Sequence, residues 1–154
     1  HPPDIEEMPT WRGPFHEFVL ADEITFPRSD YLRLIHSPSA IRIADDLIRY
    51  MGDSLDWVRT YNPATRSGSH GLNYFGPTVI EATEAAHFRR IFVVWAALFR
   101  NAPSRFILRG WWSPSSESYE RIEITRASVV ELLDSVGALA DRLVPGKYLL
   151  HFGV

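Results

Sequence analysis

The stretch ATEAAHFRRIFVVWAALFRN, residues 82–101, determines most of the expected fold. Its aromatic residues at positions 88, 92, 95 and 99 recur every three or four residues, which is the spacing of one face of an α-helix. Further apolar residues between them make the helix apolar around most of its circumference. We therefore expect residues 82–101 to form the most buried helix, packed against a sheet, with Phe92 and Trp95 almost fully enclosed.

A hairpin, a helix and a strand are predicted after this central helix. Apolar and charged residues alternate over Arg105–Trp112 and again over Tyr119–Ile124, on either side of a turn sequence, which is typical of an antiparallel hairpin. Thr125 is a good N-cap for an amphipathic helix that continues to about Leu143. Lys147–Phe152 is predicted as a final strand inserted into the sheet, because an apolar chain end would otherwise fray.

The segments before the central helix predict a strand, a helix and a wide hairpin. Phe15–Leu20 is predicted as a strand and Tyr31–Ile35 as a short extended or turn segment. Apolar residues at helical spacing predict a helix over Pro38–Met51, with Ser37 as its N-cap and Gly52 as its stop.

The wide hairpin is predicted between the two helices. Leu55–Tyr61 is its first strand, and Asn62–Gly71 is a loop rich in turn residues. Leu72–Phe75 and Thr78–Ile80 are predicted as extended pieces, interrupted by Gly76-Pro77.

This order of elements predicts an α+β fold. We expect a mostly antiparallel sheet with three helices packed against it, forming a single domain over residues 15–154. Four prolines and several acids in residues 1–14 predict an extended acidic segment before that domain.

The composition narrows the classes of function. The chain has 154 residues, of which 45% are hydrophobic, and a formal net charge of −3, which argues against a general nucleic-acid or anionic-membrane binder. Its longest apolar run, Ile91–Phe99, is far shorter than the roughly 20 residues of a membrane span, and no signal peptide is recognisable at the start. A soluble, cytoplasmic protein with no direct nucleic-acid or membrane partner is expected.

No motif for catalysis or for metal or cofactor binding is recognisable. The histidines at positions 1, 16, 36, 70, 87 and 151 include no pair at the spacing that places two imidazoles on one helix face. Cysteine, the common nucleophile motifs and phosphate-binding glycine loops are all absent from the sequence. We therefore expect no metal, no cofactor and no enzymatic activity. The alternative is a small enzyme in which His70 and nearby carboxylates form an acid–base pair in a loop-lined cleft.

Acidic and aromatic residues provide the candidate binding surface. Charged groups around exposed aromatic anchors are characteristic of protein interfaces. The candidate carboxylates lie on the first predicted helix, just after its end, and along the second hairpin: Asp45, Asp46, Asp53, Asp56, Glu117 and Glu120. Exposed aromatic side chains are expected at Trp11, Tyr61, Trp111 and Tyr119. Helical spacing places Asp46 on the polar side of its helix and Asp45 at the edge of that side, so reversing both charges should hardly change folding.

Several segments from Tyr61 onward carry a family resemblance. They are YNP at 61–63, GLNYFG at 71–76, TVI at 78–80, the tract 88–99, AP at 102–103, FILRG at 106–110, YER at 119–121 and LLHFGV at 149–154. In these segments the chain resembles small bacterial immunity proteins that neutralise the toxins of contact-dependent inhibition and other polymorphic toxin systems.

This resemblance implies a cytoplasmic, non-enzymatic protein that binds a cognate toxin domain and blocks its active site or its access to substrate. In many such systems the toxin is a nuclease, and an acidic face would attract its basic active site. The predicted toxin-binding residues are the six carboxylates with Trp111 and Tyr119, together with Arg66 and His70 in the turn-rich loop. A third alternative is an accessory interaction domain of a larger protein.

Overall fold

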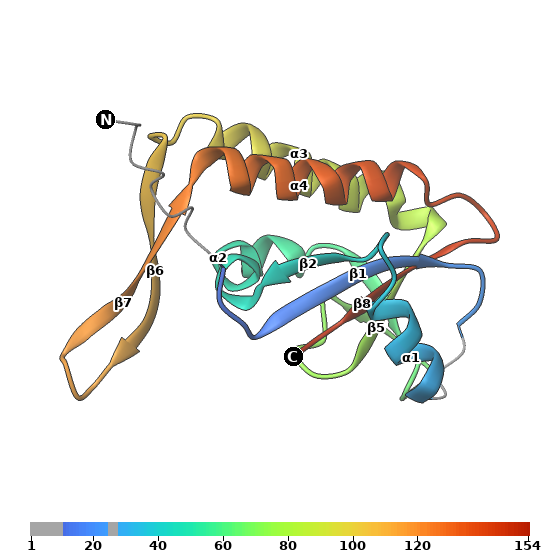
Figure 1. Cartoon of the computed structure of the whole chain (residues 1–154). Coiled ribbons are helices and arrows are strands. Elements are labelled where there is room, and N and C mark those ends of the chain that lie inside the picture. Colours follow the sequence, from blue (N-terminus) through green and yellow to red (C-terminus); the bar gives the residue numbers. More distant parts are fainter. Residues whose placement is uncertain (1–10, 25–27) are drawn as a thin grey trace.

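The chain folds around a six-stranded antiparallel sheet, as the α+β prediction requires (Figure 1). The structure, a computed structural model, describes residues 11–24 and 28–154; the predicted extended segment 1–14 therefore lies mostly outside the described residues. The strand order is β2-β1-β8-β5-β3-β4. The strands are β1 (Phe15–Ala21), β2 (Ile41–Ala44), β3 (Arg59–Asn62), β4 (Ser67–His70), β5 (Pro77–Glu81) and β8 (Tyr148–Phe152).

The remaining elements of the described residues are four helices, a short 3₁₀ turn and a separate two-stranded hairpin. The helices are α1 (Arg28–Ile35), α2 (Asp45–Leu55), α3 (Ala85–Phe99) and α4 (Arg126–Asp141), and the 3₁₀ turn Ala82–Glu84 leads into α3. The hairpin consists of β6 (Arg105–Ser113) and β7 (Ser118–Thr125). In Figure 1 the helices α3 and α4 lie side by side over one face of the sheet, and α1 lies on the opposite side.

Each face of the sheet carries its own apolar cluster. Successive side chains of a strand point to opposite faces, so Phe18 and Leu149 lie on the face under α3 and α4, whereas Val19 and Leu150 lie on the other. Leu34 of α1 packs against this second cluster. The prediction of a short extended or turn segment over Tyr31–Ile35 is therefore wrong: the segment is helical because it covers an apolar face that the local sequence does not reveal.

The predicted insertion of the last strand is confirmed. β8 lies between β1 and β5, and its His151 is directly opposite Phe18 on one side and Thr78 on the other. β3 and β4 form the opposite edge of the sheet from β2, with a turn of four residues in place of the expected ten-residue loop. The predicted extended piece Leu72–Phe75 is not a strand.

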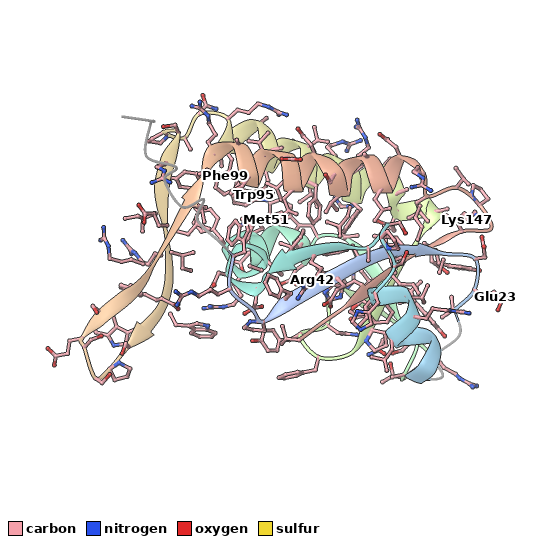
Figure 2. All side chains as sticks on the ribbon, in the orientation of Figure 1. Glu23, Arg42, Met51, Trp95, Phe99 and Lys147 are labelled. Atoms are coloured by element: carbon pink, nitrogen blue, oxygen red, sulfur yellow. The ribbon has the colours of Figure 1, made fainter. Side chains whose placement is uncertain are left out.

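The central helix is confirmed as α3, but its environment differs from the expectation. Phe88 and Phe92 are buried against Phe18 of the sheet, with ring centroids 6.1 and 6.0 Å from it. Trp95 is only partly buried, and its indole Nε1–H donates a 2.8 Å hydrogen bond to Ser54 Oγ of α2 (Figure 2). The expectation of an almost fully enclosed Trp95 is therefore wrong.

Helix α3 is also not the most buried helix. Its Val94 and Leu98 are exposed, because α4 packs along only one flank and the outer ridge faces away from the sheet. The helix α4 itself begins as predicted: Thr125 is its N-cap, and the Thr125 side chain accepts a hydrogen bond from the amide of Ser128.

The predicted helix over Pro38–Met51 is wrong in its first half. Residues 41–44 instead form β2, which pairs with β1 so that Ile41 is opposite Phe18 and Ala44 opposite Phe15. The alternation of Ile41, Arg42 and Ile43 fits a strand as well as a helix, and only the free edge of β1 decides between them. The helix α2 therefore begins at Asp45, and Ser37 does not cap it.

Gly52 does not stop this helix, because α2 continues to Leu55. A methyl group built at Gly52 would meet no atom within 4 Å. We therefore expect Gly52→Ala to raise the free energy of unfolding by about 0.5–1 kcal/mol, since alanine loses less backbone entropy than glycine in a helix. Urea denaturation followed by tryptophan fluorescence measures the effect; a destabilised variant would contradict the assigned helix.

The predicted second hairpin is confirmed as β6–β7, and it projects from the body of the domain (Figure 1). At its base Leu108 and Ile124 are buried, and Phe106 stacks on Phe99 of α3 at 5.8 Å between ring centroids. A bulge between Arg109 and Trp112 shifts the strand register toward the tip. The hairpin is therefore anchored in the core at one end and carries exposed side chains at the other.

Candidate protein-binding face

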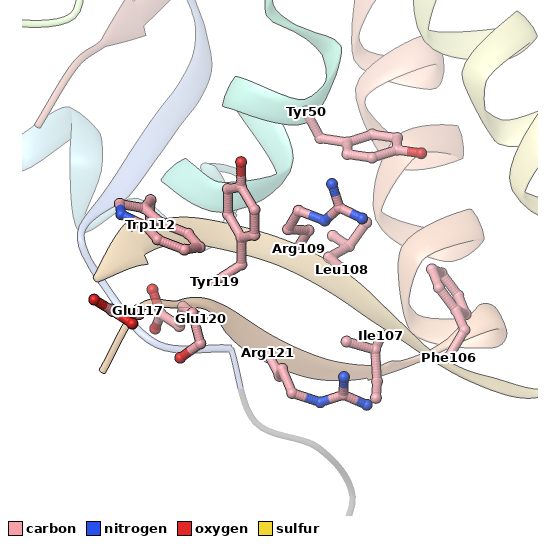
Figure 3. Close-up of a pocket in the computed structure, with 11 residues that line it drawn as sticks. Tyr50, Phe106, Ile107, Leu108, Arg109, Trp112, Glu117, Tyr119, Glu120 and Arg121 are labelled. Carbon is pink, nitrogen blue, oxygen red and sulfur yellow. The ribbon is translucent and has the colours of Figure 1, made fainter. Parts of the chain in front are cut away.

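The projecting hairpin and α2 enclose a groove of about 930 Å³, which we call the hairpin groove (Figure 3). Its lining mixes aromatic, aliphatic and charged side chains of β6, β7 and α2: Tyr50, Phe106–Arg109, Trp112 and Glu117–Arg121. Such a mixture of exposed aromatic residues and surrounding charge is characteristic of protein interfaces.

Aromatic side chains gather toward the tip of the hairpin. Trp111 and Tyr119, both predicted to be exposed, have 58% and 47% of their surface accessible. Trp112 lies opposite Tyr119 across the two strands, with the rings edge to face at 4.9 Å between centroids. The guanidinium of Arg109 lies 4.8 Å from the centre of the Tyr119 ring. The rings thus support one another while their outer surfaces stay free to contact a partner.

The hairpin contacts α2 through a cation–π interaction. The Arg49 guanidinium lies 3.2 Å from the centre of the Trp111 ring. This contact fixes the first turns of α2 beside the hairpin and places the neighbouring Tyr50 in the groove. Arg49 and Tyr50 were not among the predicted site residues, because nothing in the local sequence shows that the hairpin folds back toward this helix.

Two of the predicted carboxylates come together across this junction. Burial raises the pKa of Asp46, and the nearby charge of Glu120 raises it further; Arg49 opposes both effects, with a nitrogen 3.8 Å from the Asp46 carboxylate. Glu117 and Glu120 line the hairpin groove itself. The structure therefore brings Asp46 of α2 near Glu120, and Glu117 lines the same groove as Glu120; we call these three residues the acidic rim.

Asp53 and Asp56 lie on a neighbouring pocket of about 330 Å³ that opens above His16, which we call the His16 pocket. Both side chains are exposed. Asp56 is packed so closely against Gly71 that a methyl group there would collide with its carboxylate, and Gly71 has a φ of +73°. Arg49 lines this pocket as well as contacting Trp111, so the pocket and the junction with the hairpin share one side chain.

The placement of Asp45 on the acidic face is wrong. Only 3% of the residue is exposed, because it forms the floor of the His16 pocket at the start of α2. Its Oδ1 lies 2.7 Å from His16 Nε2, and the Tyr74 hydroxyl donates to its Oδ2 at 3.4 Å. Asp45 is therefore a structural residue that joins α2 to β1.

The Asp45 contact is one end of a buried polar chain through three strands. His16 Nδ1 lies 2.7 Å from His151 Nε2, and His151 Nδ1 lies 3.2 Å from Thr78 Oγ1. The Asn73 amide donates to the same Thr78 oxygen at 2.8 Å. His16, His151 and Thr78 are each no more than 1% exposed. We call Asp45, His16, His151 and Thr78 the buried relay.

One assignment of protons satisfies the whole relay. The Thr78 hydroxyl donates to His151 Nδ1, His151 Nε2–H donates to His16 Nδ1, and His16 Nε2–H donates to Asp45. Both nitrogens of each ring are then engaged inside the protein. Neither imidazole presents a nitrogen to the His16 pocket, so the relay lacks the free donor or acceptor that acid–base catalysis requires.

Arg66 and His70 lie on the β3–β4 hairpin. Arg66 occupies the turn with a φ of 55°, and His70 is exposed on β4, directly opposite Arg59. Neither residue lines the hairpin groove, and neither is among the charges that act on Asp46. His70 lines neither the hairpin groove nor the His16 pocket, which is where the enzyme alternative would require it.

Two of the predicted exposed aromatic residues are half-buried. Trp11 packs against the main core, and Tyr61, which lies on β3, packs against the second cluster. Trp111 and Tyr119 are thus the two members of the predicted aromatic set that remain available on the surface.

Comparison of the chain with protein-family models, with curated proteins and with solved structures gave no match. Within residues 11–24 and 28–154, no three histidine or acidic side chains are grouped so as to hold a metal ion. No helix in the part of the chain that the structure describes has both the length and the hydropathy of a membrane span.

Proposed function

We propose that this protein is an immunity protein that binds a cognate bacterial toxin domain through the hairpin groove and the acidic rim. The observation that carries the proposal is the combination of a projecting aromatic hairpin with carboxylates from two elements at its junction with α2. The family resemblance of residues 61–154 supports it independently. The toxin would be blocked by occlusion of its active site or of its access to substrate.

The charge of the acidic rim indicates the kind of surface that the toxin presents. Asp46 and Glu120 repel each other, and Arg49 compensates only in part. A basic toxin surface would relieve this repulsion and would be attracted over a distance of about 8–10 Å at moderate salt. A nuclease active site, which binds a polyanion, has such a surface.

The direct test is co-expression with the toxin encoded beside the gene for this chain. We expect the two proteins to co-purify as a stable complex and the host cell to survive. A pair that neither co-purifies nor protects the cell would overturn the proposal.

Charge reversal at the rim should slow association. We expect Asp46→Lys combined with Glu120→Lys to lower the association rate constant by about tenfold or more at low salt, because steering by the rim is reversed. Raising the salt concentration should lower the association rate constant of the unaltered pair, and it should reduce the difference in this rate constant between the unaltered protein and the variant. The control is Glu81→Lys with Glu131→Lys, which makes the same change in net charge at exposed positions outside the face. Surface plasmon resonance measures both; equal rates for the two double variants would contradict a role for the rim.

Substitutions at the aromatic tip of the hairpin should instead change the dissociation rate constant. We expect Trp111→Ala or Tyr119→Ala to raise the dissociation rate constant by about tenfold or more, with little dependence on salt, because each removes an anchor from the interface. Phe75→Ala is the matched control, since Phe75 is an exposed aromatic residue that lies outside the β6–β7 hairpin. If Phe75→Ala weakens the complex and the tip variants do not, the binding face lies elsewhere.

A further inference from the structure

The buried relay contains two histidines that lie in contact inside the core. Their rings are stacked at 5.0 Å between centroids with an interplanar angle of 22°, and their nearest nitrogens are 2.7 Å apart. His151 lies in the central strand β8 and is fully buried, with the Phe18 ring 5.1 Å away on the same face of the sheet. Buried titratable pairs of this kind are sensitive to pH because their charged forms are costly in the interior.

The relay can accommodate one additional proton but not two. A proton on His16 would face the carboxylate of Asp45 at 2.7 Å, so that cation has a partner. Among the described residues, a proton on His151 would meet no carboxylate, since its ring nitrogens face His16 and Thr78. With both rings charged, two imidazolium groups would be 2.7 Å apart, and the repulsion would add to the cost of burial.

We propose that His151 makes the buried relay an acid-sensitive lock of this fold, held closed while His151 is neutral and forced open when it must take up a proton. The lock ties together four elements: Asp45 begins α2, His16 lies on β1, His151 on β8 and Thr78 on β5. Acidification therefore weakens the contact between the central strands and the helix at one point. This inference is independent of the proposed toxin binding.

The titratable and charged groups around the lock come mainly from α2 and from the segment before β5. Asp45, Asp46 and Arg49 come from α2, and Tyr74 from the segment before β5, whereas Asp53 and Asp56 lie further out on the His16 pocket. Asp45 is the acid in contact with the rings, and it contacts His16 rather than His151. Burial, followed by the positive charge that His16 has when it is protonated, lowers the pKa of His151 well below its ordinary value of about 6.5.

The sign of the pH effect follows from this lowered pKa. Below about pH 6.5 the unfolded chain protonates His151 and the folded chain does not, so the unfolded state binds more protons and stability falls as the pH falls. The stabilisation is fully present above that pH and is lost as the pH falls toward the folded pKa. Between pH 7.5 and pH 5.5 this one group should raise the equilibrium constant of unfolding about tenfold.

The test compares His151→Gln with the unaltered protein by urea denaturation at pH 7.5 and pH 5.5. Glutamine keeps a neutral donor and acceptor in the relay but cannot be protonated. We expect the unfolding constant of the variant to rise about tenfold less than that of the unaltered protein over this interval. His70→Gln is the control, since His70 is exposed, and it should retain the full rise. An equal rise in His151→Gln and the unaltered protein would overturn the proposal.

A second measurement decides the matter if His151→Gln does not fold. In the unaltered protein, the NMR signals of the His151 ring carbons and their protons should not titrate between pH 7.5 and pH 5.5. A His151 ring that titrates near pH 6.5 while the protein remains folded would overturn the lock, because its proton would then cost the fold nothing.

Discussion

Replacing Asp45 by lysine is expected to destabilise the protein by about 3–5 kcal/mol, a large share of the 5–15 kcal/mol that holds a typical domain together. The substitution removes the acceptor of His16 and of the Tyr74 hydroxyl and places an ammonium group in a site that is 3% exposed. Chemical denaturation followed by circular dichroism measures the change. This expectation replaces the one drawn from helical spacing, in which reversal of Asp45 leaves folding intact.

The adjacent Asp46→Lys is the matched control for this result. Asp46 is only half-buried, and its contact with Arg49 is a 3.8 Å ion pair on the surface of α2. Such pairs contribute about 0–1 kcal/mol, so the Asp46 variant should remain folded. If Asp45→Lys is as stable as Asp46→Lys, the buried relay does not hold α2 to the sheet as described.

Phe92→Ala alone is expected to cost about 3–5 kcal/mol of stability, because the ring is fully buried against Phe18 of the sheet and Phe88 of its own helix. Its centroid lies 4.7 Å from that of Phe88, and the truncation would leave a cavity that these rigid neighbours cannot fill. Trp95→Ala should cost less, since the indole is only partly buried; the change removes its packing on Tyr50 and Phe99 together with the hydrogen bond to Ser54.

Urea denaturation of Phe92→Ala and Trp95→Ala shows which variant loses more stability, and this comparison tests the position of α3. A larger loss for Trp95→Ala than for Phe92→Ala would mean that the helix is rotated from its described position. Trp95→Phe separates the two contributions of the indole, because it keeps an aromatic ring and removes only the donor to Ser54.

The sequence predicted those elements in which apolar residues recur with a single period, either that of a helix or that of a strand. The helices α3 and α4 have apolar residues at helical spacing over four or more turns, and β6 and β7 alternate on either side of a turn, so each was placed correctly. The final strand was also expected in the sheet. Predictions for long periodic segments are reliable because many apolar residues have to fall on the same face of the element.

Short segments could not be assigned in this way. Ile41 and Ile43 suit either a strand or a helix, and the exposed edge of β1 is what makes residues 41–44 a strand. Residues 28–35 form a helix because the second face of the sheet needs cover, which depends on residues more than 100 positions away in β8. Part of the candidate surface could be predicted from the sequence. Trp111, Tyr119, Glu117 and Glu120 belong to the hairpin that the alternation of apolar and charged residues predicts.

The sequence by itself therefore determined the α+β class, the two long helices, the projecting hairpin and its exposed aromatic tip, since these depend on spacing within one element. The tertiary structure alone decided which charges are on the surface. Asp45 and Asp46 are adjacent in the sequence. Asp45 is nevertheless buried in contact with His16, whereas Asp46 lies near Glu120. His16 and His151 are 135 positions apart and meet because β8 inserts beside β1. Strand order and register fix such contacts, and no local pattern contains them.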